Sequence, residues 1–89
     1  MSLPSLRRKI DRIDDEIIGL LGERMTLALR TAEFKTAVRD AAREKAIVSR
    51  LQARAAASNR ISPEFVAALY ELIFDESRKA QQALISKEG

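Results

Sequence analysis

The first third of the chain carries an apolar residue at about every third or fourth position, as one face of a helix does. The pattern starts after Pro4, with Ser5 as the expected N-cap, and continues to about Lys35 or Val38. The apolar stripe consists of Leu6, Ile10, Ile13, Ile17, Leu20, Leu27 and Phe34. A helix of roughly thirty residues is ~45 Å long, and an 89-residue chain cannot cover its stripe alone. We therefore expect a second copy of this helix to pack against the first.

Two shorter helices are expected after the long one. The second begins near Asp40, a good N-cap, and frays through residues 55–59. The third begins at Ser62, where a capping serine precedes a proline at the first helical position. Its apolar face consists of Val66, Leu69, Ile73, Ala80 and Leu84. Because no segment alternates with period two, the sequence predicts one all-α domain over residues 1–89.

Composition narrows the chemistry open to such a domain. The chain has no Cys and no His, which removes disulfides, ordinary zinc sites and the commonest general base. We expect no metal, no cofactor, no membrane segment and a cytoplasmic location. The 16 basic residues outnumber the 13 acidic ones, which favours anionic partners. Nucleic acid is not expected, because the basic residues are spread over every helix without aromatic residues for base stacking.

Arg24 occupies the position in the apolar stripe between Leu20 and Leu27. A guanidinium stays charged and is costly to desolvate alone, so an anion is expected beside it. The adjacent Glu23 points to a different face of the helix. Two explanations remain open at this stage: an ion pair with an acid of another helix, such as Glu76, or a bound anionic ligand.

Other polar residues also fall on the expected inner faces of the helices. They are Arg43 in the second helix and Ser77 and Gln81 in the third. Lys35 lies three helical turns beyond Arg24 at nearly the same azimuth. Taken singly, each has an ordinary explanation as a solvated or packing residue. Together, three cations, a hydroxyl and an amide predict a site for a small anion.

Arg7 requires a different explanation because it lies 17 residues before Arg24. That separation is about 25 Å along a straight helix and ~100° in azimuth, too far to share one small ligand. From the far end of an antiparallel partner helix, Arg7 can reach that ligand. The long apolar stripe independently predicts such a partner.

These residues, in this order, resemble the all-helical (AroQ-type) chorismate mutases. The matching positions are residues 6–14, 20–24, 39–44 and 81–82, together with Lys35 and Ser77. The resemblance covers nearly the whole chain. It implies a three-helix protomer whose long first helices intertwine in a homodimer with two composite active sites.

The resemblance also implies a role for each polar residue. Arg24 and Arg43 of one chain, with Arg7 of its partner, would hold the two carboxylates of chorismate. Lys35 and Gln81 would donate to the ether oxygen whose bond breaks. The pocket would be completed by Asp40, Glu44 and Ser77. The implied reaction converts chorismate to prephenate without a nucleophile, a proton transfer or a metal.

One departure from the family pattern keeps alternatives open. The connection formed by residues 36–39 is roughly one helical turn shorter than the family pattern. Relatives on the same scaffold act as isochorismate pyruvate lyases or 4-amino-4-deoxychorismate mutases. A non-catalytic helical dimerisation module is the alternative of another class. It predicts that Arg24 and Lys35 pair with protein carboxylates and leave no pocket.

Overall fold

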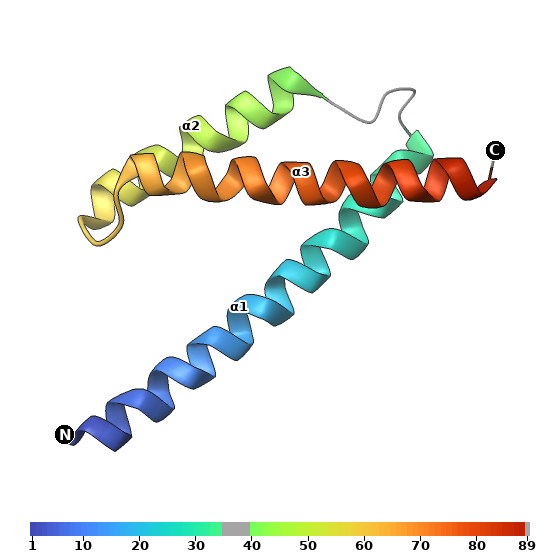
Figure 1. The fold of residues 1–89 in the computed structure, drawn as a ribbon. Coiled ribbons are helices and arrows are strands. Elements are labelled where there is room, and N and C mark those ends of the chain that lie inside the picture. The colour runs from blue at the N-terminus through green and yellow to red at the C-terminus, as the bar shows by residue number, and fades with distance from the viewer. Residues whose placement is uncertain (35–39, 89) are drawn as a thin grey trace.

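The computed structural model describes residues 1–34 and 40–88, without the side chains of residues 85, 87 and 88. The elements in these ranges are α1 (Leu3–Thr31), the 3-10 turn η1 (Ala32–Phe34), α2 (Ala41–Ser58) and α3 (Pro63–Glu88). The predicted all-α fold with three helices and a long first helix is confirmed. α2 and α3 form an antiparallel hairpin, and the C-terminal part of α1 packs across α3 (Figure 1). None of these described helices is both long enough and apolar enough to span a membrane.

The start of α1 differs from the expectation. Ser2 is the N-cap, and its hydroxyl accepts a hydrogen bond from the Ser5 amide at 3.2 Å. The prediction that Ser5 caps the helix is therefore wrong. Pro4 explains the error, because a proline fits inside the first turn, where its missing N–H has no helical partner.

The end of α1 also comes earlier than expected. The α-helix stops at Thr31, and residues 32–34 continue as a single 3-10 turn. The backbone N–H of Ala32 meets the carbonyls of Leu29 and Arg30, the tightening typical of a helix end. The predicted end at Lys35 or Val38 is therefore too late, and residues 35–39 lie outside the described part of the chain.

The hairpin of α2 and α3 has the expected caps. The Asp40 carboxylate accepts the Arg43 amide at 3.0 Å, and the Ser62 hydroxyl accepts the Phe65 amide at 3.1 Å. Asn59 ends α2 in the left-handed conformation, with φ 56° and ψ 25°. The two caps fix the starts of α2 and α3, and the left-handed Asn59 fixes the end of α2.

The buried core of the described chain is small and belongs to the hairpin. Its apolar members are Ile47 and Ala55 of α2 with Val66 and Phe74 of α3. α2 stays helical to Ser58 rather than fraying from Ala55 as expected, and Ala55 is buried within it. Since α1 contributes no fully buried residue, this core alone offers little stabilisation to the long helix.

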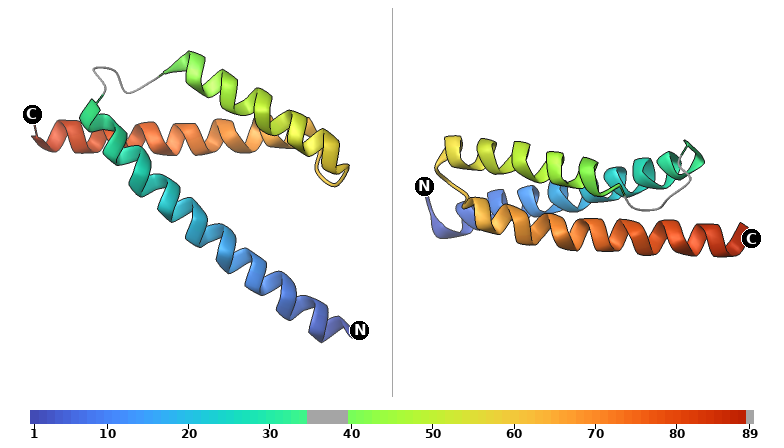
Figure 2. Two further views of the ribbon diagram at one scale, coloured as in Figure 1. Left: turned by 180° about the vertical axis from the view of Figure 1, so that it is seen from behind. Right: turned by 90° about the horizontal axis from the view of Figure 1, so that it is seen from above.

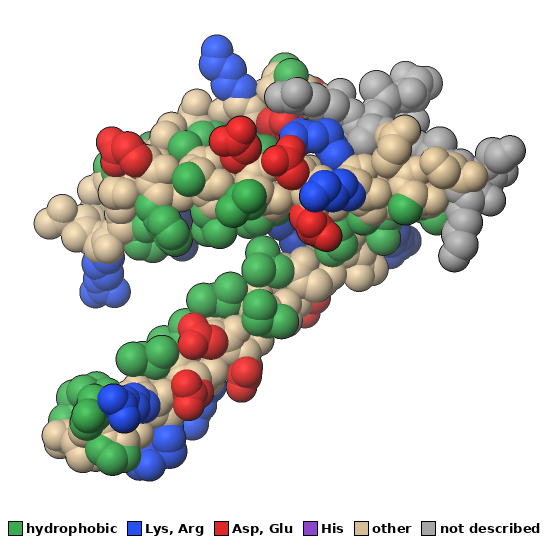
Figure 3. Space-filling model, viewed as in Figure 1, with side chains coloured by type: hydrophobic (Ala, Val, Ile, Leu, Met, Phe, Trp, Pro, Cys, Tyr) green, Lys and Arg blue, Asp and Glu red, His purple; other side chains and the backbone are tan. Residues whose placement is uncertain are grey.

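The apolar stripe of α1 remains open to solvent in one chain. Its six residues from Leu6 to Leu27 are 39–63% exposed. The N-terminal part of α1 projects away from the hairpin (Figures 1 and 2), and hydrophobic side chains gather along the side that faces it (Figure 3). The radius of gyration is 16.2 Å, against about 12 Å for a compact domain of this length. A single chain therefore leaves its longest helix largely uncovered.

The left-handed residue Asn59 gives a direct test of the hairpin. Asn59→Gly should change the free energy of unfolding by less than about 1 kcal/mol, because glycine adopts this conformation freely. Asn59→Val should lower it by about 1–2 kcal/mol, since a β-branched side chain clashes there. Urea unfolding of both variants checks this. Equal stability of the two would show that the turn does not hold this conformation.

Candidate functional site

A pocket of about 280 Å³ opens where the end of α1, the start of α2 and the middle of α3 meet. Apolar walls come from all three helices, for example Leu27, Ile47 and Phe74. Most of the polar residues singled out in the sequence also line it: Arg24, Asp40, Arg43, Glu44, Ser77 and Gln81. The fold therefore brings residues from three separate segments to one small cavity.

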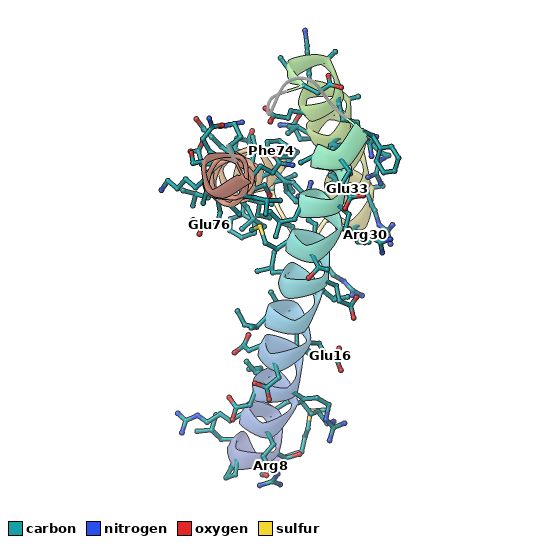
Figure 4. The ribbon with its side chains drawn as sticks, turned by 90° about the vertical axis from the view of Figure 1, so that its right-hand side faces the viewer. Arg8, Glu16, Arg30, Glu33, Phe74 and Glu76 are labelled. Atoms are coloured by element: carbon teal, nitrogen blue, oxygen red, sulfur yellow. The ribbon has the colours of Figure 1, made fainter. Side chains whose placement is uncertain are left out.

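Arg24 lies against two aromatic rings of α3. Its guanidinium carbon is 5.7 Å from the ring centroid of Tyr70 and 5.6 Å from that of Phe74. Phe74 lies on the side of α3 that faces α1, whereas Glu76 lies on another side (Figure 4). Among the described residues no carboxylate pairs with Arg24, so the ion pair with Glu76 is not formed. The cation–π contacts hold the charge in place and leave its N–H groups for an anion.

The start of α2 brings a second arginine to the pocket. Asp40 uses one carboxylate oxygen to cap the helix, and this fixes the first turn that carries Arg43. The Arg43 side chain is exposed in one chain, although the sequence placed it on the buried side of the helix. It forms no ion pair with any other residue in the described ranges. The positive end of the helix dipole adds to its field at the pocket.

α3 contributes two buried polar side chains, as the spacing of the sequence predicted. Gln81 is 5% exposed, and its Nε2 donates a hydrogen bond to the Ala28 carbonyl at 2.7 Å. Ser77 is 8% exposed, and its hydroxyl has no hydrogen-bond partner within the described chain. A buried hydroxyl without a partner is costly, so a ligand that pairs with it gains affinity.

Arg78 is the pocket residue that the sequence analysis missed. Its Nη1 donates to Glu44 Oε2 at 2.8 Å, and its Nη2 pairs with Asp75 one turn earlier. Arg78 lies four residues after Phe74 and three before Gln81, both of which face inward. That spacing was the available signal, because i, i+4 and i, i+3 positions share a helix face.

Two residues singled out in the sequence are not brought to this pocket by the described chain. Arg7 lies near the start of α1, is exposed and does not line the cavity. The helix between Arg7 and Arg24 is unbroken, so the separation of about 25 Å along the axis holds. Lys35 lies outside the described residues.

Comparison with known proteins finds one family and relatives whose names all include chorismate mutase. Residues 6–82 match the family described as chorismate mutase type II. The bifunctional chorismate mutase/prephenate dehydratases of Enterobacter agglomerans and Escherichia coli K12 are 35% and 33% identical over 96% of this chain. The chain spans 23% of their length. The chorismate mutase of Methanocaldococcus jannaschii is 26% identical, and the match covers 96% of this chain and 89% of that protein.

No solved structure matches the chain significantly. The match to the family covers most of the sequence, including the pocket residues from Arg24 to Gln81. The chain therefore belongs to the type II chorismate mutase family, and the resemblance noted from the sequence is confirmed.

Tyr70 offers a reporter for ligand binding, because it is the sole tyrosine of a chain without tryptophan. A saturated dicarboxylate that does not absorb with tyrosine should draw the Arg24 guanidinium from the ring and change the fluorescence saturably. Fluorescence titration measures this. Arg24→Met should abolish the response, whereas an unchanged response in that variant would contradict the contact between Arg24 and the ligand.

Proposed function

We propose that this chain catalyses the rearrangement of chorismate to prephenate, acting as one domain over residues 1–89. The observation that carries the proposal is the pocket itself. Arg24 and Arg43 pair with no described carboxylate, and the buried Ser77 hydroxyl has no described partner. A small dicarboxylate with a hydroxyl group supplies what these three side chains lack. Family membership and the names of the relatives identify that molecule as chorismate.

Binding energy is proposed to come mainly from charge. Arg24 and Arg43 approach the cavity from different helices, so their guanidinium groups can each hold one carboxylate. Two fixed cations select a compact conformer of the substrate, in which the atoms that must bond lie close together. The reaction is unimolecular, so this restriction lowers the barrier directly. Asp40, Glu44 and Ser77 are proposed to line the rest of the substrate, with Ser77 donating to an oxygen.

Electrostatic stabilisation of the breaking ether bond is proposed to come from Gln81 and Lys35. The Gln81 amide has two N–H groups on Nε2, and the Ala28 carbonyl accepts one of them. That contact orients the amide. The second N–H makes only a long contact of 3.5 Å with Thr31 Oγ1, and we propose that it turns to the ether oxygen, where negative charge grows in the transition state. Lys35 is proposed to donate a charge-assisted hydrogen bond to the same oxygen. This chemistry uses no metal and no cofactor, and we propose that it takes place in the cytoplasm.

The second part of the proposal is an intertwined homodimer. The apolar stripe of α1 is uncovered in one chain, and a matching stripe of a second copy has the length needed to cover it. Gly19 and Gly22 each cost helix stability, yet nothing lies within 4 Å of a Cβ built at either. A close partner helix would explain both glycines. It would also carry Arg7 to the pocket of the other chain.

A non-catalytic dimerisation module is the weaker reading. It predicts that Arg24 and Lys35 pair with protein carboxylates and that the chain leaves no pocket, and Lys35 lies outside the described residues. The described residues give Arg24 aromatic partners instead, beside a cavity of about 280 Å³.

Incubation with chorismate tests the proposed activity. We expect loss of the chorismate absorbance and formation of prephenate, identified by its mass. Parallel incubations with isochorismate and 4-amino-4-deoxychorismate separate the related reactions on this scaffold. Turnover of either alternative substrate with none of chorismate would contradict the proposal.

Lys35→Ala tests the proposed stabilisation of the ether oxygen. Removal of a donor that acts mainly in the transition state should lower kcat by about 100-fold or more, with a smaller effect on KM. Steady-state kinetics on chorismate measures both values, and Lys79→Ala serves as a charge-matched control, because Lys79 is exposed and does not line the pocket. Near-normal kcat in Lys35→Ala would show that this lysine does not act on the reaction.

Mixing two inactive variants tests the composite site. Arg7→Ala and Arg24→Ala should each be nearly inactive as homodimers. A heterodimer places both lesions in one pocket and leaves the other intact, so random equal mixing should restore up to about a quarter of wild-type activity. Activity is measured after subunit exchange has been verified by mass spectrometry of tagged chains. Exchange without recovered activity would show that Arg7 does not serve the partner's pocket.

A further inference from the structure

Arg78 connects the proposed active site to the packing of the hairpin. Its guanidinium bridges Glu44 on α2 and Asp75 on its own helix, and the side chain is only 25% exposed. Glu44 lines the pocket with an 18% exposed side chain, whereas Asp75 is 49% exposed and lies outside the pocket. Arg78 therefore connects the Glu44 carboxylate, which lines the pocket, to Asp75 on α3.

We propose that Arg78 is a positioning residue that holds the Glu44 carboxylate in the pocket wall and offsets its charge, so that a dianionic substrate can bind there. This inference rests on the proposed function, because it specifies how the same site accepts a dicarboxylate. Neither the reaction nor the comparisons assign a role to Arg78.

The charges of the pocket explain why such a residue is needed. Its described charged lining comprises Arg24, Arg43 and Arg78 against Asp40 and Glu44, three positive groups and two negative ones. Without Arg78 this lining would be neutral overall while receiving a substrate with two negative charges. The offset acts through Glu44: once Arg78 is lost, the Glu44 carboxylate is no longer held by this contact and repels the dianion across a partly buried wall, where screening by water is reduced, whereas a neutral glutamine at that position would not.

The geometry of the contact requires arginine in particular. The guanidinium is planar and presents several donors, so it engages Glu44 with one nitrogen and Asp75 with the other. A lysine at the same position carries the charge on a single nitrogen and is a poorer bridge between two carboxylates. Arg78→Lys should therefore keep the offset of charge but lose part of the positioning.

A direct contact between Arg78 and the substrate is the competing explanation, and a double-mutant cycle separates the two. The cycle uses Arg78→Met, Glu44→Gln and the double variant, with kcat and KM for chorismate measured for each. If Arg78 acts through Glu44, Arg78→Met should raise KM about tenfold in the wild type and less than about threefold in the Glu44→Gln background. If Arg78 binds substrate directly, its effect should be the same in both backgrounds.

Two further variants exclude a merely structural role. Lys79→Met removes the same charge from the neighbouring position on α3. Lys79 is exposed and does not line the proposed site, so KM should stay within about twofold. Arg78→Lys should recover part of the KM lost in Arg78→Met. Loss of packing alone would instead lower the midpoint of thermal unfolding in Arg78→Met and leave KM unchanged once the protein is folded.

The outcomes separate this inference from the proposed function. A wild-type chain that turns over chorismate, with a KM effect of Arg78→Met that shrinks in the Glu44→Gln background, supports the inference. Turnover by the wild type with an unchanged KM in Arg78→Met, or with equal effects in both backgrounds, overturns the inference and leaves the function standing. A wild type that does not act on chorismate overturns the function, and the positioning role fails with it.

Discussion

The first helix carries more apolar surface than the rest of the chain can cover. α1 is 29 residues long, about 43 Å, while the hairpin of α2 and α3 meets only its C-terminal part. Burial of apolar surface is the main favourable contribution to folding, so a stripe with this exposure leaves the described chain short of stabilisation. The small core of the hairpin does not make up the difference. In the proposed dimer, the matching stripe of a second copy of the chain would cover this surface.

The pocket depends on the same helix. The end of α1 crosses α3, and this crossing lays Arg24 over Tyr70 and Phe74 and brings the Ala28 carbonyl to the amide of Gln81. Any change in how α1 is held would shift these contacts together. The same helix therefore carries the uncovered stripe and part of the pocket wall, and Arg24 belongs to both. Preorganised charges are what a unimolecular rearrangement can use.

Local signals in the sequence were sufficient to predict the α2–α3 hairpin and many of the residues that line the pocket. Asp40 marks the start of a helix by its capping chemistry, and the four-residue spacing of Ser77 and Gln81 places both on one inner face. The aromatic partners of Arg24 could not be predicted in this way, because they depend on where two helices cross. Arg78 was missed for a related reason, since its role depends on a carboxylate brought near by a different helix. Periodicity within one helix predicts which of its residues face inward, but it does not predict which residues of other helices contact them.

The central claim is that α1 is stable only when a second chain covers its stripe. Equilibrium unfolding measured over a wide range of protein concentration tests this most directly, because unfolding of an obligate dimer depends on mass action. For an obligate dimer we expect a single transition whose midpoint rises with concentration, with dimers and no folded monomer in sedimentation at the same concentrations. A midpoint independent of concentration, with a cooperatively folded monomer, would contradict it.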